Sequence, residues 1–442
     1  MNRNASGRKA GPRLSSDAFS SFWRKAGTRS VLASLVAILI GMLAGGVIIA
    51  VVGMTSGNLG AKSVWEGIRL VVGGLFATGR DTAGNLTFGF NPASFGNMLF
   101  RAAPLIMTGL SVALGNKAGL FNIGAPGQYL AGTAASLYTA LSLPSNVLPT
   151  WLIWITAFLT GMLAGALWGA IPGLLKAFLN INEVLACIMT NWIAANLVTW
   201  LFDIGNLKNV LEGTKSSYIY KTSTVLNDVI VSKAVNGETV RVAATVGEAL
   251  PEGAEYVATR GGVSTAKMGL DSLFSGSQVN AGILVAILLA VIVYVLLSKT
   301  TMGYQIKACG ANRYAARYAG IQDKRNIVLT MAMAGALAAA GAALYYLSGN
   351  TEFYWNTYQS LPSEGFNGIP VALLAINNPV GVVFSAIFMS MLQICGQKLT
   401  ELTAYNEYIT NVIISVIVYL SAFMLVIKSW IISLQKGKAV KK

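Results

Sequence analysis

Four stretches without a single Asp, Glu, Lys or Arg constrain this chain more than any other feature. They cover residues 30–61, 118–175, 272–298 and 326–351. A helix needs about 20 apolar residues to cross a bilayer, so the longest stretch has room for two spans with a turn near 144–146. Only 11% of all residues are charged, against about 25% in a soluble domain. The sequence therefore predicts an all-α polytopic membrane protein.

Basic residues set the expected orientation. Residues 1–30 hold seven cations against Asp17 alone, the tail 428–442 holds five lysines, and the segment 299–326 holds six cations against one acid. By the positive-inside rule all three segments lie in the cytosol. The net charge of +15 is then explained by the anchoring of membrane helices, and nucleic acid is not an expected partner. The apolar stretch 31–54 is too long for the core of a cleaved signal peptide and is interpreted as the first span.

We expect about ten transmembrane helices, some of them broken or half-length. Spans one to five occupy 31–202 and spans six to ten occupy 272–427. The stretch 119–132 is so rich in glycine that a broken helix is predicted, since irregular backbone in a membrane must be buried in protein or line a cavity. The stretch 361–376 is short and contains Gly365, Gly368 and Pro370, so it is interpreted as a half-span that enters from outside.

Residues 203–271 have a different character and predict a small β-rich extracytoplasmic insert. Acids and bases nearly balance there, and apolar and polar residues alternate on both sides of Asn236-Gly237. An Asn-Gly pair between alternating segments is a strong hairpin signal. An odd number of spans precedes the insert, which places it outside the cell. A surface receptor was also considered, but a receptor does not need ten spans.

The basic segment 299–326 predicts a docking site for a cytosolic partner. It connects two uncharged runs, and residues 315–319 read as a short helix bounded by Gly310 and Gly320 as breakers. The alternative interpretation is an ordinary basic loop.

Several kinds of chemistry are missing from the chain. Histidine is absent, which removes the commonest general base and metal ligand, and neither a metal nor a cofactor is expected in this chain. Gly213-Thr214-Lys215 lacks the order of a P-loop, so this chain cannot itself hold ATP phosphates in one, and any energy source must come from another subunit. The predicted spans hold almost no acids or bases, which disfavours a proton-coupled carrier or channel. A Na⁺ site built from backbone carbonyls stays open. The three cysteines fall in predicted spans or in the cytosolic segment, where no disulfide is expected.

Uncharged polar residues within the spans are the candidates for a solute pathway. Asn122 and Asn367 are favoured because each lies in a glycine-rich broken segment. The alternative for the amides is a hydrogen bond between helices, and for the aromatic residues it is ordinary packing. The full set of candidates comprises Asn122, Gln128, Asn191, Trp192, Asn196, Phe366, Asn367 and Gln393.

Four motifs, in this order and spacing, resemble a known family. They are GLFNIGAPGQYLAG at 119–132, INEVLACIMTNWIA at 181–194, TTMGYQIKACGANRYAARYAGI at 300–321 and GFNGIPVALLA at 365–375. The chain resembles the permease subunits of ABC importers in the ribose and branched-chain amino acid permease superfamily, and within it the larger permease of nucleoside importers. The resemblance covers most of 31–427 outside the β-rich insert.

The resemblance implies an ATP-driven importer in a bacterial plasma membrane, with nucleosides as the solute and simple sugars as the alternative. Its implied partners are a second permease, cytosolic ATPases that bind ATP and Mg²⁺, and an extracytoplasmic substrate-binding lipoprotein. Ala125-Pro126 stands where the family more often has Ala-Glu, which removes an acid from the implied pathway. The residues that match the family's ATPase-coupling segment are Gly303, Gly310, Asn312, Ala316, Arg317 and Gly320.

Overall fold

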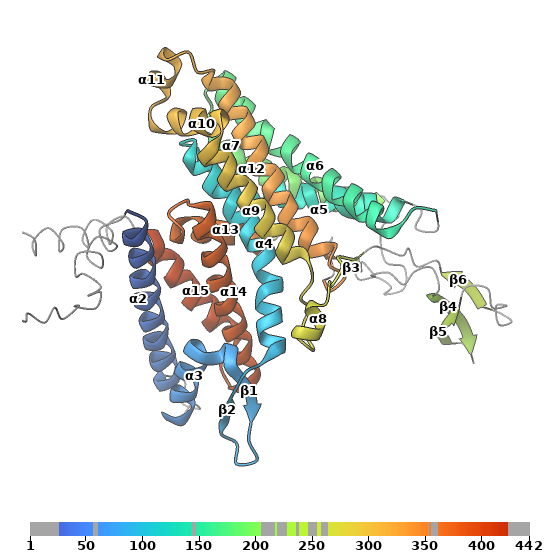
Figure 1. Ribbon diagram of the computed structural model, residues 1–442. Helices are drawn as coiled ribbons and strands as arrows, with labels where there is room; N and C mark the ends of the chain where they lie inside the picture. Colours follow the sequence, from blue (N-terminus) through green and yellow to red (C-terminus); the bar gives the residue numbers. More distant parts are fainter. Residues whose placement is uncertain are drawn as a thin grey trace, which may run out of the picture.

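The computed structural model of the chain (Figure 1) describes residues 26–55, 61–143, 147–204, 217–218, 228–235, 238–245, 254–257, 264–351, 353–354 and 361–422. This part of the chain is predominantly helical. Six of its helices are long and apolar enough to cross a membrane, namely α4 (Pro92–Lys117), α6 (Thr150–Leu179), α7 (Glu183–Ile204), α9 (Gly282–Lys299), α12 (Asp323–Tyr346) and α14 (Pro379–Leu402). Four further apolar helices accompany them, namely α2 (Ala26–Thr55), α5 (Ala125–Ser142), α13 (Ser363–Leu374) and α15 (Glu407–Ala422).

Helix α4 is the centre of the fold. Asn91 caps its start by accepting a hydrogen bond from the backbone N–H of Ser94 at 3.1 Å, and Pro92 occupies the first turn, where its missing N–H is harmless. Helices α9, α12, α13 and α14 all pack against α4, and most of its residues are buried. A helix that is buried all round needs no polar face, which explains its almost uncharged sequence.

Glycines allow α6 and α12 to cross closely. Gly161, Gly165, Gly169 and Gly173 recur at every fourth position of α6, and α12 makes its most extensive contact with this helix. A Cβ atom added to Gly335 of α12 would lie 2.0 Å from the carbonyl oxygen of Gly165. Small residues at this spacing let helix backbones approach each other, which is how helices associate in lipid.

Helices α5 and α13 begin inside the protein rather than at its ends. The side chain of Asn122 donates to Ser111 Oγ at 3.0 Å, which holds the start of α5 beside the second half of α4. A Cβ atom added to Gly365 of α13 would lie 2.5 Å from Cα of Pro126, so the two helix N-termini meet. The broken helix predicted at 119–132 and the short helix predicted within 361–376 are therefore both present.

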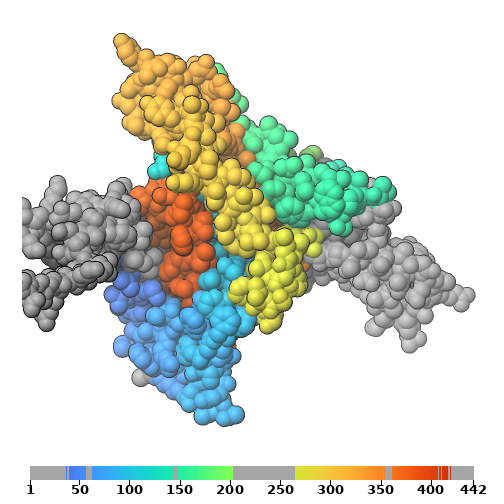
Figure 2. All heavy atoms as spheres, in the orientation of Figure 1, coloured from blue at the N-terminus to red at the C-terminus, as the bar shows by residue number. Residues whose placement is uncertain are grey.

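The two ends of α4 define two ends of the molecule. At the "hairpin end", α3 (Ala61–Gly73) and the 3-10 turn η1 (Gly74–Phe76) lead into the antiparallel strands β1 (Ala77–Arg80) and β2 (Leu86–Phe88). At the opposite "basic end", α10 (Thr301–Ala311) and α11 (Arg313–Tyr318) project beyond the other helices (Figures 1 and 2). Helix α14 runs the opposite way to α4, from the basic end to the hairpin end.

Short strands occur between α7 and α9. β4 (Asp228–Val235) pairs antiparallel with β5 (Glu238–Thr245) and with β6 (Ala254–Val257). The pairing predicted on both sides of 236–237 is confirmed, although the two turn residues lie outside the described part. A second small sheet pairs β3 (Ser217–Tyr218) with β7 (Phe353–Tyr354). The short helix α8 (Leu270–Leu273) precedes α9. The side of the membrane on which these strands lie stays a prediction.

The prediction for 299–326 was partly wrong. The short helix predicted at 315–319 is present as α11, and Gly320 follows it with φ +82°. The preceding helix α10 was not predicted, and Gly310 lies inside it. Gly310 is a close-approach residue and not a breaker, because an added Cβ would lie 2.2 Å from the carbonyl oxygen of Lys117. Most of residues 1–30 and all of 428–442, which were expected in the cytosol, lie outside the described residues.

Candidate functional site: a polar cavity and a basic helix pair

A polar cavity of about 670 Å³ lies between α4, α13, α14 and α15, on the side of the molecule nearer the hairpin end. It is bounded by the first half of α4, the start of α13 and the last turns of α14. Its volume is in the range of small-molecule binding pockets. Most of the residues that line it carry polar side chains, namely Arg101, Tyr345, Ser363, Glu364, Asn367, Gln393, Gln397, Thr400, Glu401, Asn411 and Ser415.

Two of these charged side chains have no oppositely charged neighbour in the described part of the chain. Within the described residues, neither Arg101 nor Glu364 has an opposite charge within 4.0 Å, whereas Glu401 is paired with Lys398 at 2.5 Å. Glu364 lies in the first turn of α13, where the helix dipole favours a carboxylate. Glu364 accepts a hydrogen bond from its neighbour Ser363 Oγ at 3.3 Å. The remaining lone pairs of its carboxylate and the Arg101 guanidinium are available to water or to a solute.

An aromatic face adjoins these groups. Tyr345 lines the cavity, and Phe100 stacks behind it with ring centroids 5.6 Å apart and an interplanar angle of 24°. Tyr346 meets the Tyr345 ring edge-on at 5.2 Å. Packing on two sides fixes the ring in place. A fixed flat ring beside hydrogen-bonding groups can hold a planar heterocycle that carries polar substituents.

The structure places only two of the predicted pathway residues, Asn367 and Gln393, among the residues that line this cavity. Asn122 and Gln128 bond to each other instead, through reciprocal amide contacts of 2.8 and 3.0 Å. Asn191 accepts from the backbone N–H of Gly127 at 2.9 Å and donates to the carbonyl oxygen of Ile123 at 3.0 Å. These three amides hold the broken start of α5 in place, and their role in transport stays a prediction.

The other three candidates lie apart from the cavity lining. Trp192 and Asn196 are on the exposed outer face of α7, where Asn196 donates to the backbone carbonyl of Trp192 at 2.9 Å. Phe366 is 38% exposed on α13. The role of these three side chains in solute passage likewise stays a prediction.

The sequence analysis did not propose the charged residues of the cavity as pathway candidates. It found almost no charge within the spans, yet Arg101, Glu364 and Glu401 line the wall. One signal was present, since Glu364 is the single charged residue between Glu352 and Lys398. A lone acid in an apolar membrane segment marks a functional position.

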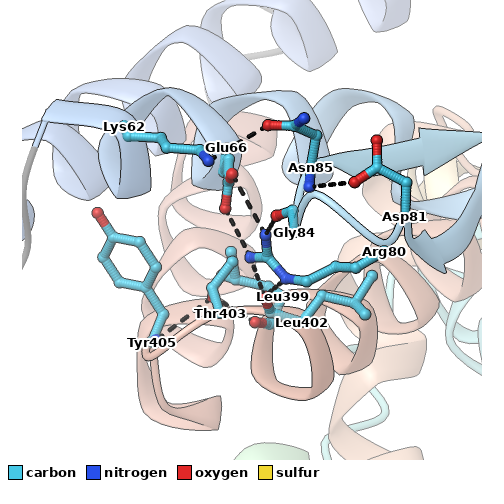
Figure 3. A network of polar contacts seen from close by, with 10 residues as sticks. All are labelled: Lys62, Glu66, Arg80, Asp81, Gly84, Asn85, Leu399, Leu402, Thr403 and Tyr405. Atoms are coloured by element: carbon cyan, nitrogen blue, oxygen red, sulfur yellow. Dashed lines mark hydrogen bonds and ion pairs between the residues drawn. The ribbon is translucent and has the colours of Figure 1, made fainter.

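An ion-pair cluster at the hairpin end holds the rim of the cavity (Figure 3). Arg80 pairs with Glu66 of α3 at 2.6 Å and also donates to the carbonyl oxygen of Leu402, the last residue of α14. The hydrogen bond to Glu66 raises the pKa of Arg80, so the guanidinium stays charged. Because Thr400 and Glu401 line the cavity directly before Leu402, this cluster fixes one side of the opening.

The basic end has a rigid frame. Thr300 caps α10 and Asn312 caps α11, each accepting from a backbone N–H, at 3.1 and 3.0 Å. Arg313 pairs with Asp323 of α12 at 2.7 Å, and Arg317 lies 3.6 Å from the same carboxylate. Burial raises the pKa of the Cys309 thiol, and the charge of Asp323 acts in the same direction. Two caps and two ion pairs tie the helix pair to α9 and α12.

The residues matched to a coupling segment mostly build this frame. Gly303 allows α10 to approach the end of α9, Ala316 is buried, and Gly320 adopts φ +82°. The outward surface is formed by tyrosines that the sequence analysis did not single out. Tyr314 and Tyr318 of α11 are 82% and 97% exposed. Their spacing of four residues was the available signal, since it puts both on one helix face.

Known proteins resemble the chain over nearly its whole length. It is 32% identical to the nucleoside ABC transporter permease protein NupB of Lactococcus lactis subsp. cremoris, covering 94% of this chain and 96% of the relative. It is 28% identical to the guanosine ABC transporter permease protein NupP of Bacillus subtilis, covering 93% and 97%. A glucose ABC transporter permease protein of Haloferax volcanii is 29% identical over 68% of each chain. No solved structure matches.

The sequence model of one family, described as the permease component of branched-chain amino acid transport systems, matches residues 94–422. This range includes both the cavity and the basic helix pair. Together with the relatives above, it makes the chain a multi-pass transport component of the plasma membrane rather than an enzyme. The chain belongs to the branched-chain amino acid transport system permease family.

Proposed function

We propose that this chain forms the membrane pathway for nucleosides in an ATP-driven ABC importer. The observation that carries the proposal is the cavity, which sets the fixed ring of Tyr345 beside Arg101, Glu364 and Asn367. A nucleoside offers a flat base for the ring and hydroxyl and N–H groups for the polar side chains. Two relatives that cover almost the whole chain are a nucleoside and a guanosine permease.

We further propose that the basic end faces the cytosol. Its surplus of Lys and Arg supports this orientation, as does the outward display of Tyr314 and Tyr318. A partner ATPase, which binds ATP and Mg²⁺, would dock on α11. The hairpin end, the β4–β6 sheet and a substrate-binding lipoprotein would lie outside, and both termini inside. The ten proposed crossings are α2, α4, α5, α6, α7, α9, α12, the half-length α13, α14 and α15. A second permease would complete the pathway.

Uptake of labelled nucleoside by cells tests the proposal. Cells that lack this chain should lose high-affinity nucleoside uptake, and a plasmid copy should restore it. A partner ATPase that binds but cannot hydrolyse ATP should abolish uptake equally. Labelled glucose is the comparison solute, because one relative is a glucose permease. Restored uptake of glucose alone would contradict the proposed solute, and uptake that survives loss of the ATPase would contradict the proposed energy source.

A further inference from the structure

A groove beside the basic helix pair combines an apolar wall with two cations. It lies between the end of α6 and the start of α12 and has a volume of about 560 Å³. Its apolar wall is formed by Leu174, Phe178, Val328 and Leu329, and its charged rim includes Lys324 and Arg325. Phe178 is 62% exposed. Because α6 and α12 are both long enough to span a membrane, the groove lies where two spans reach the membrane surface.

The nearby carboxylates do not neutralise these two cations. Asp323, which lies in the same groove, is occupied by Arg313 and Arg317 of α11. Within the described part of the chain, neither Lys324 nor Arg325 has a carboxylate within 4.0 Å. The other nearby acid, Glu183, is paired with Lys176 at 2.9 Å.

The cations also lie directly against the apolar wall. The Lys324 ammonium is 5.1 Å from the ring centroid of Phe178, within range of a cation–π contact. Arg325 follows it at the start of α12, and Val328 and Leu329 continue the wall one turn further along the same helix. A ligand that satisfies this arrangement must carry a negative group at one end and an apolar chain at the other.

We propose that this groove binds an anionic phospholipid of the phosphatidylglycerol class. Its phosphate would lie between Lys324 and Arg325, and an acyl chain would cover Leu174, Phe178, Val328 and Leu329. Basic pockets between transmembrane helices at the membrane surface bind lipid head groups in this way. A zwitterionic lipid would bring its own cation towards Lys324 and Arg325 and therefore binds less well. The site is independent of the transported solute.

Native mass spectrometry of the full-length chain in neutral detergent tests the site, with phosphatidylglycerol and phosphatidylcholine as the two probes. The wild type should retain phosphatidylglycerol in preference. The double variant K324Q/R325Q should bind it about 25-fold more weakly, since one basic residue near an anionic surface contributes about fivefold. The control K299Q/K307Q removes the same charge from two exposed lysines outside the groove, and it should bind as the wild type does.

Further measurements distinguish phosphatidylglycerol from other possible occupants of the groove. Inorganic phosphate should not displace the lipid, and F178A should weaken lipid retention although both cations remain. Equal retention of the two lipids, equal losses in both double variants, or displacement by inorganic phosphate would overturn the proposal. So would a K324Q/R325Q variant that keeps its lipid but no longer co-purifies with the ATPase, which would assign the groove to that subunit. A thermal unfolding curve shows that each variant is folded, and the single variant K324Q replaces the double one if that is unstable.

Discussion

The crossing of α6 and α12 makes a quantitative prediction about Gly335→Ala. The added Cβ would lie 2.0 Å from the carbonyl oxygen of Gly165, and the next nearest atoms are also backbone atoms of α6. An acceptable carbon–oxygen contact is about 3.3 Å, so the two helices must separate locally by about 1.3 Å. Backbone cannot rotate away as a side chain would. The most extensive helix contact in the described part of the chain must therefore open.

The magnitude follows from two costs and one gain. Overpacking costs about 1–3 kcal/mol, and the rigid backbone partner puts this site at the upper end of that range. A gap of about 0.5–1 Å also removes a quarter to a half of each dispersion contact nearby. Replacing glycine by alanine inside a helix returns about 1 kcal/mol of helix propensity. We therefore expect Gly335→Ala to lose about 1–2 kcal/mol of unfolding free energy.

Gly46→Ala is the matched control, because a Cβ added at this position of α2 meets no atom within 4 Å. Only the propensity gain applies there, so this variant should be at least as stable as the wild type. A thiol-reactive dye can follow thermal unfolding of the purified chain, since the three free cysteines are buried, at Cys187, Cys309 and Cys395. A thermal unfolding midpoint for Gly335→Ala at or above the wild-type value would refute the predicted clash between α6 and α12.

Three further predictions concern the rim, the basic end and the cavity. Arg80→Gln should lower stability by about 1–3 kcal/mol, because it leaves the buried Glu66 carboxylate without its partner; the same dye assay measures it, and an unchanged midpoint would count against the cluster. Gly310→Ala should reduce uptake more than ATP hydrolysis in the reconstituted complex, because it pushes α10 away from the end of α4; a parallel loss of both activities would contradict this. Glu364→Gln should reduce nucleoside uptake at least about tenfold, as expected for a lost hydrogen bond to a charged group. Glu401→Gln should reduce it less because that acid is already paired, and the reverse order would exclude Glu364 as a solute contact.

The sequence predicts the positions of the long apolar helices well because length and lack of charge determine them directly. The uncharged run at 326–351 became α12, and the glycine-rich 119–132 became the broken start of α5. The same reasoning fails where a glycine has a tertiary cause. Gly310 looks like a helix breaker in the sequence, but it lies within α10 because the backbone of residues 117–119 passes directly beside it. The partner in that contact is almost 200 positions away, so no local pattern can reveal it.

The cavity was harder to predict because a polar residue serves a solute only if no protein neighbour has already occupied it. Asn122 and Gln128 were reasonable candidates by residue type and position, but each satisfies the other. Glu364 lines the cavity, has no opposite charge within 4.0 Å in the described structure, and accepts a hydrogen bond from its neighbour Ser363, so most of its carboxylate lone pairs remain available. Sequence gives the inventory of donors and acceptors, and only the packed structure shows which of them remain available.

The same distinction links the lipid groove to α11. Asp323 is occupied by α11, and so Lys324 and Arg325 are left to the membrane surface. Any movement of α11 that withdrew Arg313 from Asp323 would free a carboxylate beside those cations and weaken their hold on an anionic ligand. Binding and α11 position are therefore linked in both directions. An anionic lipid in the groove should favour the position of α11 seen here, in which Asp323 is paired with Arg313.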